Sequence, residues 1–397
     1  MRSVRVLPLV LVLLAVSFPS LAQTPLGPEF RVNVRTGGEQ RFLQVAMNAR
    51  GDFVVVWSSR ESAWDEYSLY ARRFAADGTP ATDEIPVLEN TFYSAEVAVA
   101  VMEDGSFVVV YAAYSDAQPG SATFHFEGRR FAADGSPLGG PFAIGTGHAA
   151  ADLSAASRPG GGFVVAWEAY RTTPEISVRI RIFDGNGSPV RNEISLAEGN
   201  DPALAVGPDG EIVVAWMAVE PGDDHGRYFV VAQRLSKNGA LRGQRFVVSR
   251  KEERFVDAIR VAKDGTGSFS VFWNEDFGSL GPGAFFRRYS WKGVRLTGIK
   301  RLASWRLTPA IAMEENGDFV MVWSEEKGAG DPDVFWRRFR ALGQPAGWAF
   351  RANTTRPGDQ EWADVAGDGA GNFVVVWLGE EQDGSGSGVF ARLYRRP

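Results

Sequence analysis

The sequence predicts an all-β protein made of seven copies of one four-stranded repeat. Three observations support this prediction. Residues 51–57, with the sequence GDFVVVW, recur in seven similar copies that lie 49 to 57 residues apart, a period typical of repeat architectures. Every copy has glycine two residues before its anchor position (Phe53 in the first copy) and alanine seven residues before it. No stretch shows the 3.6-residue apolar period of a helix.

The second strand of each repeat is the run that follows this glycine. It is short, β-branched and apolar without polar alternation, which is typical of a strand buried on both faces. Its last residue is aromatic in every copy: Trp57, Tyr111, Trp167, Trp216, Trp273, Trp323 and Trp377. Because one residue type recurs at one position of every repeat, we expect these side chains to pack between neighbouring sheets rather than to bind a ligand.

The first strand lies just upstream of the glycine, as in residues 97–102 and 203–206, and consists largely of small residues. Turns such as Asp104-Gly105 and Asn316-Gly317 join it to the second strand, because these residue pairs adopt the positive φ that tight hairpins need. A strand restricted to small side chains is expected where several copies crowd around one axis.

The third and fourth strands follow, as in residues 70–74 and 85–88, and a turn at residues 77–80 joins them. Arginine recurs on the third strand at Arg72, Arg129, Arg181, Arg287, Arg337 and Arg392. We expect their stems to cover apolar surface, or their charges to pair with acids of the next strand, rather than to clamp an anionic ligand.

Seven such repeats resemble a seven-bladed β-propeller of a bacterial secreted type, similar to sialidase-like and integrin-type propellers in fold only. The predicted single domain spans residues 23–397. The last repeat stops at residues 395–397, before its fourth strand, whereas residues 25–32 match residues 137–144 from the fourth-strand region of the second repeat. We therefore expect the N-terminal strand to complete the last blade and close the ring.

Residues 1–22 have the pattern of a signal peptide, with Arg2 and Arg5 before the apolar residues 7–18 and small residues at 20–22. This segment is too short to span a bilayer, and no later segment is suited to a membrane span. We expect an exported monomer, periplasmic or extracellular. Loss of the two arginines would take the formal charge from −6 to −8, which disfavours nucleic acid as a partner. The absence of cysteine excludes disulfides.

The loops between second and third strands differ from repeat to repeat, and variable loops are where binding residues concentrate. They are expected on one face of the ring and are rich in acids, among them Glu61, Asp116, Glu168, Glu275, Glu325 and Glu380. The candidate ligand-binding residues of this face are Trp64, Tyr67, Tyr114, Tyr170, Asp223, Asp224, His225, Tyr228, Trp305 and Trp362.

We therefore expect a non-catalytic binding or scaffold propeller whose partner is a protein or a glycan. The alternative is a carbohydrate-active enzyme, a sialidase-like glycosidase or a lyase, with its site at the mouth of the central channel. An enzyme should bring Arg, Tyr and Glu or Asp together there. No sequence pattern singles out a catalytic residue or a cofactor. Calcium is the alternative, but the Asp-Gly turns supply one or two side-chain ligands where calcium loops need several.

Overall fold

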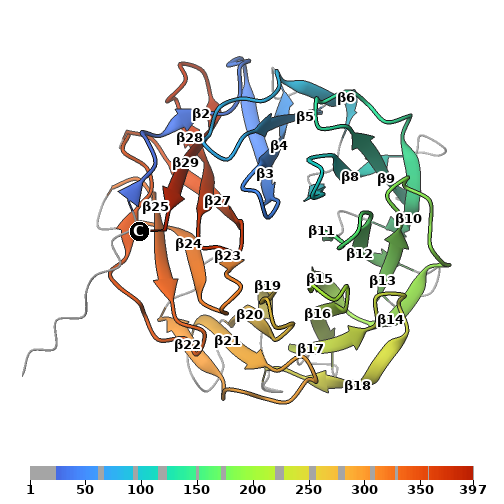
Figure 1. Cartoon of the computed structure of the whole chain (residues 1–397). Helices are drawn as coiled ribbons and strands as arrows, with labels where there is room; N and C mark the ends of the chain where they lie inside the picture. The colour runs from blue at the N-terminus through green and yellow to red at the C-terminus, as the bar shows by residue number, and fades with distance from the viewer. Residues whose placement is uncertain are drawn as a thin grey trace, which may run out of the picture.

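The computed structural model describes residues 24–60, 67–92, 97–114, 123–148, 152–170, 176–219, 228–249, 256–275, 282–304, 309–326, 330–355 and 357–396. In these residues the regular structure consists of strands, arranged as seven antiparallel sheets in a ring around a central channel (Figure 1). None of the described residues forms a helix that is long and apolar enough to cross a membrane.

Each blade runs from an inner strand beside the channel to an outer strand at the rim. Blades one to three contain β3 (Glu39–Met47), β4 (Phe53–Arg60), β5 (Tyr67–Phe74), β6 (Ile85–Phe92); β7 (Val97–Val101), β8 (Phe107–Tyr114), β9 (Thr123–Phe131), β10 (Phe142–His148); β11 (Leu153–Ser157), β12 (Phe163–Tyr170), β13 (Ile176–Phe183) and β14 (Ile194–Glu198). Blades four and five contain β15 (Asn200–Val206), β16 (Ile212–Val219), β17 (Tyr228–Leu235), β18 (Leu241–Val247); β19 (Val256–Lys263), β20 (Phe269–Glu275), β21 (Gly283–Tyr289) and β22 (Lys300–Ala303). Blade six contains β23 (Ala310–Met313), β24 (Phe319–Glu325), β25 (Asp333–Phe339) and β26 (Phe350–Arg351), and blade seven contains β27 (Gln360–Gly367), β28 (Phe373–Glu380) and β29 (Ser387–Arg395).

The N-terminal residues supply the outer strand of blade seven, which confirms the predicted closure. β1 (Thr24–Pro25) and β2 (Phe30–Arg31) both pair antiparallel with β29. Phe30 lies opposite Ala391, and the Val32 amide donates to the carbonyl of Val389 at 2.8 Å. Figure 1 shows the start of the ring, in blue, beside its end, in red. The first and last strands of the described chain therefore share one sheet.

The core consists of apolar layers between neighbouring blades, as expected for strands that are buried on both faces. One layer contains Val55 of blade one, Val376 of blade seven and Val32 of the N-terminal segment. The aromatic residue that ends the repeated apolar run packs in these layers: Trp57, Trp167, Trp216, Trp273 and Trp377 are each at most 1% exposed. The predicted structural role of this column is thus confirmed.

The arginines of the third strands join successive blades. Arg72 donates to the carbonyl of Val32, Arg129 to Val87, Arg181 to Ile144, Arg287 to Val248 and Arg392 to Ala352, at 2.6 to 3.0 Å. In each of these five cases the acceptor belongs to the outer strand, or the residue just after it, of the preceding blade. Of the two expected roles, the structure supports the covering of apolar surface: Arg72 lies 5.4 Å over the Phe74 ring and Arg129 5.6 Å over the Phe131 ring. The partners of these guanidinium groups among the described residues are carbonyls rather than acids of the next strand. The acceptor is a backbone carbonyl, because the outer strand leaves its outer edge unpaired.

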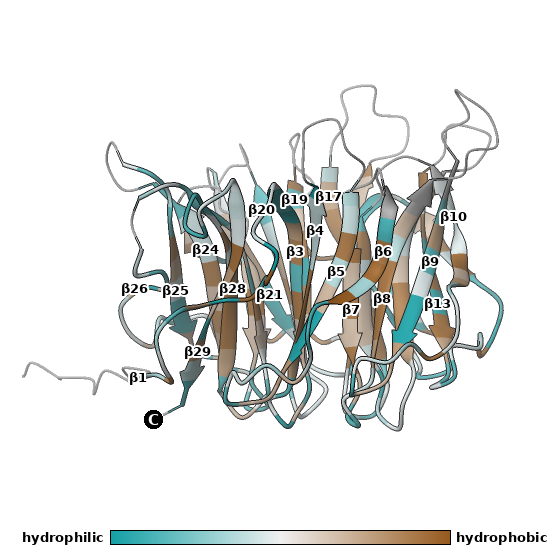
Figure 2. Ribbon diagram, turned by 90° about the horizontal axis from the view of Figure 1, so that it is seen from above, coloured by the Kyte–Doolittle hydropathy of each residue, from teal (hydrophilic) through white to brown (hydrophobic). Residues whose placement is uncertain are grey.

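The two faces of the ring differ. The turns between first and second strands, and between third and fourth strands, lie on the lower edge in Figure 2, together with the C-terminus. We call this edge the short-turn face. Its turns use glycines at positive φ, such as Gly105 at 87° and Gly317 at 88°. The inner strands begin at the opposite edge, which we call the channel mouth.

Candidate functional site

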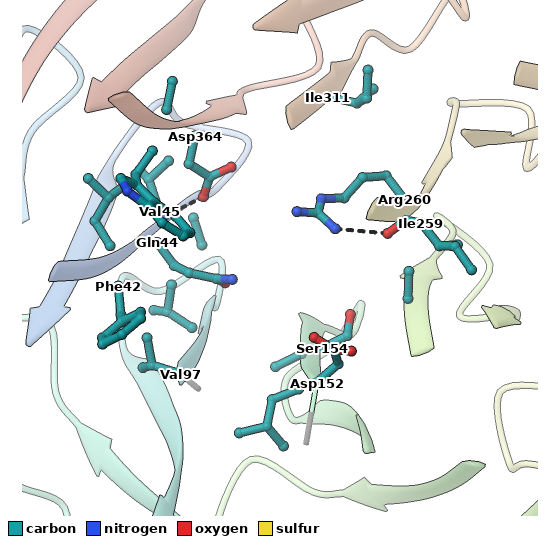
Figure 3. Close-up of a pocket in the computed structure, with 18 of the residues that line it drawn as sticks. Phe42, Gln44, Val45, Val97, Asp152, Ser154, Ile259, Arg260, Ile311 and Asp364 are labelled. Atoms are coloured by element: carbon teal, nitrogen blue, oxygen red, sulfur yellow. Dashed lines mark hydrogen bonds between the residues drawn. The ribbon is translucent and has the colours of Figure 1, made fainter. Parts of the chain in front are cut away.

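A cavity of about 630 Å³ occupies the central channel, and its lining includes residues from all seven blades. Most of the lining comes from the inner strands, including residues 42–46 of β3, 201–203 of β15 and 361–364 of β27, so the cavity lies within the ring that these strands form. In the close-up of Figure 3, Arg260 of β19 extends into the middle of the channel, with Asp364 of β27 and Asp152, just before β11, around it. Gln44 of β3 completes this polar group.

Four of the seven inner strands contain a β-bulge at the equivalent position. β3, β15, β19 and β27 each shift register near their start. The first residue of each shift has a left-handed backbone, with φ of 49° at Phe42, 52° at Asp201, 50° at Ala258 and 54° at Trp362. Bulges redirect side chains and are common beside functional sites, and non-glycine residues in this conformation are strained. Phe42, Asp201 and Trp362 all line the cavity.

The carboxyl groups of the channel outnumber its positive charges. Asp152, Asp201 and Asp364 line the cavity together with Arg260, and Glu168 of β12 lies behind Asp201, whose backbone N–H donates to the Glu168 carboxylate. The Arg260 guanidinium donates to the carbonyl of Ile259 at 2.9 Å. Its positive charge lowers the pKa of Asp152, Asp201 and Asp364 against the larger opposing effect of burial.

The net effect on these acids is a raised pKa. Burial raises the pKa of Asp201, and the negative charge of Asp152 raises it further. Burial, followed by the charges of Asp152 and Asp201, raises the pKa of Glu168 to about 7. Burial also raises the pKa of Asp364. Burial and a neighbouring negative charge both favour the protonated form of a carboxyl group. Near neutral pH these acids can therefore donate as well as accept hydrogen bonds.

Some polar channel residues also join one inner strand to the next. Asp364 accepts a hydrogen bond from the Val45 amide at 2.9 Å, which joins blade seven to blade one. Ser154 accepts from the Leu204 amide at 3.1 Å, and Asp201 accepts from the Ile259 amide at 3.3 Å. These bonds fix the acids on the channel wall. Arg260 makes no such bond to the next blade in the described part of the chain.

An aromatic group stands at the channel mouth between blades seven and one. Trp362 is 59% exposed, and its ring lies edge to face with that of Phe42, with ring centroids 6.5 Å apart. Phe42 in turn contacts Tyr67 of β5 in the same manner, at 6.1 Å, and Arg60 lies 5.0 Å over the Tyr67 ring. The site thus has an exposed aromatic surface beside a buried polar one.

Of the predicted site residues, the structure brings Tyr67 and Trp362 together at this aromatic group. Tyr228 begins β17 and is half-buried. Tyr114 and Tyr170 end β8 and β12, but their side chains lie outside the described part of the structure. Trp64, Asp223, Asp224, His225 and Trp305 also lie outside the described residues.

The predicted acidic loops need one correction. Glu168 and Glu275 lie within strands β12 and β20 and are 9% and 6% exposed. They therefore do not belong to a solvated rim. The second strand is longer than the apolar run that predicted it, because its pairing with the third strand continues past the aromatic residue: Glu168 lies opposite Val178 and Glu275 opposite Gly283.

Sequence reasoning missed Asp152, Asp201, Arg260 and Asp364. A signal for two of them was present. Nine residues before the anchor position, three repeats have alanine (Ala98, Ala203, Ala310) and the other four have Gln44, Ser154, Arg260 and Asp364. Charged residues in a column of small ones mark positions where the repeat has been altered for something other than packing.

The lining brings Arg and Asp together, as expected of an enzyme, but contains no tyrosine among the described residues. The same part of the chain holds no group of three or more acidic or histidine side chains that is suited to bind a metal ion. Both catalysis and binding are therefore compatible with the geometry.

No protein-family model and no curated protein matches the chain. Among solved structures it is similar to a protein of unknown function from Dyadobacter fermentans, with a TM-score of 0.57 and 12% identity over 96% of this chain and 100% of that one. It is also similar to the β-propeller domain of the Trilobed protease from Pyrococcus furiosus, with a TM-score of 0.50 and 12% identity over 88% of this chain and 89% of that one. An α-L-arabinanase from Penicillium chrysogenum in complex with arabinobiose has a TM-score of 0.49 and 13% identity over 75% of this chain and 92% of the enzyme. These similarities concern the fold alone.

Proposed function

We propose that the protein is a carbohydrate-binding β-propeller that holds an oligosaccharide at its channel mouth. The observation that carries this proposal is that exposed Trp362, backed by Phe42, lines the same cavity as Arg260 and the buried acids. A sugar ring has a C–H face and an edge of hydroxyl groups. Aromatic rings pack against such a face, and a few placed polar groups fix the orientation of the bound molecule.

A glycan suits this site better than a protein partner. The cavity of about 630 Å³ has the size of small-ligand sites, roughly 300–1,000 Å³. A stable protein interface needs about 800 Å² on each partner, whereas the aromatic and charged groups here surround a channel. We place this binding outside the cytoplasm, because residues 1–22 have the pattern of a signal peptide.

The test starts with a glycan array that identifies a bound oligosaccharide, whose affinity is then measured by titration calorimetry. Trp362→Ala is expected to weaken binding about tenfold or more, the equivalent of about 1.4 kcal/mol. The matched control is Trp348→Ala. Trp348 is also exposed, at 78%, but lies between β25 and β26 on the opposite face. This control should bind the glycan as the wild type does.

Two results would contradict the proposal. One is an array on which no glycan is bound. The other is a bound glycan whose affinity falls with Trp348→Ala and not with Trp362→Ala. Arg260→Gln, which removes the channel's cation at similar size, is a second probe. It should also weaken binding, because the ligand would lose its donor in the middle of the channel.

A second candidate function is glycoside hydrolysis, and one observation favours it. Asp152 and Asp201 both line the cavity, and the charge of one raises the pKa of the other. A protonated and an ionised carboxyl group on either side of a glycosidic bond perform acid–base hydrolysis. Chromatography of the bound oligosaccharide after long incubation separates the two functions. Shortened products that disappear with Asp201→Asn and Asp152→Asn would show catalysis, and an intact oligosaccharide would show binding alone.

A further inference from the structure

The hairpins between third and fourth strands carry opposite charges on the two halves of the ring. In blades four to six, residues 236–248, 290–304 and 340–352 contain nine lysines and arginines and no acid. In blades one to three, the equivalent residues 75–88, 132–144 and 184–197 contain six acids and one arginine. The chain as a whole has a formal charge of −6, so the first set is a positive segment of a negative protein. Two of its arginines pair with acids of the turns between first and second strands on the same face, Arg242 with Glu211 at 3.9 Å and Arg340 with Asp318 at 3.1 Å.

The positive half also exposes large apolar side chains. Leu241, Trp291, Val294, Leu296, Leu342 and Trp348 are between 48% and 78% exposed. Seven basic side chains of the same three blades are themselves exposed: Lys237, Arg242, Arg245, Lys292, Arg295, Lys300 and Arg340. The Lys292 ammonium group lies 5.0 Å over the Trp291 ring. We call these thirteen residues the basic–aromatic rim.

The rim is continuous, because each hairpin packs against the blade before it. Arg234, near the end of β17 in blade four, donates to the carbonyls of Trp291 in blade five and of Arg242 in its own blade, at 2.5 and 3.5 Å. The backbone of Gly343 in blade six packs against the Phe286 ring of blade five. The apolar and basic side chains therefore form one surface along three neighbouring blades of the short-turn face.

We propose that the basic–aromatic rim binds the surface of a lipid bilayer that contains anionic headgroups. Lysine and arginine near such a surface are each attracted by roughly 1 kcal/mol, and exposed tryptophan and aliphatic side chains insert at the boundary between headgroups and acyl chains. The apolar side chains lie on hairpins at the edge of the ring, where a bilayer reaches all of them at once. The acidic hairpins of blades one to three are repelled by the same surface, so the ring meets the bilayer on the edge formed by blades four to six.

The experiment measures co-sedimentation with vesicles, using protein that starts at Thr24, so that the apolar residues 7–18 are absent and bind no lipid themselves. The described ring begins at this residue. Vesicles of equal parts phosphatidylglycerol and phosphatidylcholine should bind the protein at low salt, and vesicles of phosphatidylcholine alone should not. Binding should be lost in 1 M salt, where the screening length falls to about 3 Å.

Two variants and one control test the assignment to the rim. The double variant Trp291→Ser, Trp348→Ser should weaken vesicle binding about tenfold or more, and the triple variant Lys292→Glu, Arg295→Glu, Lys300→Glu should abolish it. The control Trp362→Ser, on the other face, should bind vesicles as the wild type does. Lys300 lies in β22, and the other substituted residues lie in turns or at a bulge. Circular dichroism checks that each variant is folded.

Three results would overturn the proposal. The wild-type protein could fail to bind the anionic vesicles, both rim variants could bind them unchanged, or Trp362→Ser could lose binding. Soluble heparin distinguishes a lipid surface from an anionic polymer. If the double tryptophan variant binds heparin and anionic vesicles as tightly as the wild type does, the rim recognises negative charge alone and the lipid assignment is wrong.

Discussion

At the scale of single residues, Glu168 shows how the ring sets the chemistry of a side chain. It follows Trp167 in β12 and is 9% exposed. Its carboxyl group lies near Asp152, just before β11, and Asp201 of β15. Burial and these two charges raise its pKa to about 7, whereas an ordinary glutamate titrates near 4.3. The native state therefore holds a proton, between about pH 4.3 and 7, that the unfolded chain has released.

This difference predicts how stability depends on pH. Ionisation of Glu168 destabilises the native state above pH 7, and the penalty disappears as pH falls through 7 toward 4.3. Glu168→Gln removes the charge, and its side-chain oxygen still accepts the hydrogen bond from the Asp201 amide. We expect the melting temperature of this variant to exceed that of the wild type at pH 8 and to match it at pH 5, as measured by differential scanning calorimetry.

The control for this prediction is Glu103→Gln, since Glu103 lies exposed on a turn. Its melting temperature should differ little from that of the wild type at either pH. A Glu168→Gln variant that is less stable than the wild type at pH 8 would mean that the ionised carboxylate stabilises the fold, and that its neighbours do not act on it as described.

Residue identities alone were insufficient to predict the polar channel. The sequence predicts Trp362 as a site residue, because it does not recur in the other repeats, and the structure places it at the cavity. Nothing in the sequence distinguishes Asp201 and Asp152 from other acids near strand ends, which are ordinarily solvated. Their burial arises only when ring closure brings seven inner strands together, and no spacing along the chain records that approach. Arg260 was detectable by comparing repeats column by column.

At the scale of strands, most of the fold follows from the repeat. The predicted third strand of blade one, residues 70–74, and its fourth strand, residues 85–88, are contained in β5 and β6. The inner strand of blade four, predicted at residues 203–206, begins three residues earlier, because β15 continues through a bulge at Asp201. A bulge breaks the alternation on which strand prediction depends, which is why these extensions were not predicted.

The N-terminal strand is the element whose removal has the clearest consequence. Deletion of residues 25–35 removes the amide of Val32 and the side chain of Asn33, which both bond to β29 through Val389. It also removes the carbonyl that Arg72 reaches. We expect a lower melting temperature and aggregation by light scattering, because β29 becomes an unpaired edge.

A synthetic peptide of residues 24–36 provides the control for this deletion. Added in excess, it should occupy the vacant edge and restore a monodisperse profile and much of the melting temperature. A deleted protein that stays monodisperse and melts as the wild type does would show that the N-terminal strand is dispensable for ring closure.

At the scale of the whole molecule, the two proposed sites lie on opposite faces. The inner strands begin at the channel mouth, and the hairpins of the basic–aromatic rim lie on the short-turn face (Figure 2). A second strand such as β16 has eight residues, so the faces are roughly 25 Å apart at 3.3 Å per residue. This separation exceeds the screening length of about 8 Å at physiological salt. Charges at one face therefore have little effect on the other.

This arrangement predicts that glycan and lipid bind independently. Coupling between two sites requires that one ligand change the free energy of binding the other. The glycan site and the lipid site share no residue, and the electrostatic interaction between them is screened. The glycan affinity measured by calorimetry should therefore agree within about twofold with and without saturating phosphatidylglycerol vesicles. The Trp291→Ser, Trp348→Ser variant, which should not bind vesicles, gives the baseline. If vesicles displace the glycan, the two ligands compete for one face, and one of the two assignments is wrong. Equal glycan affinities are expected if the basic–aromatic rim contacts the bilayer while the channel mouth stays open to solvent.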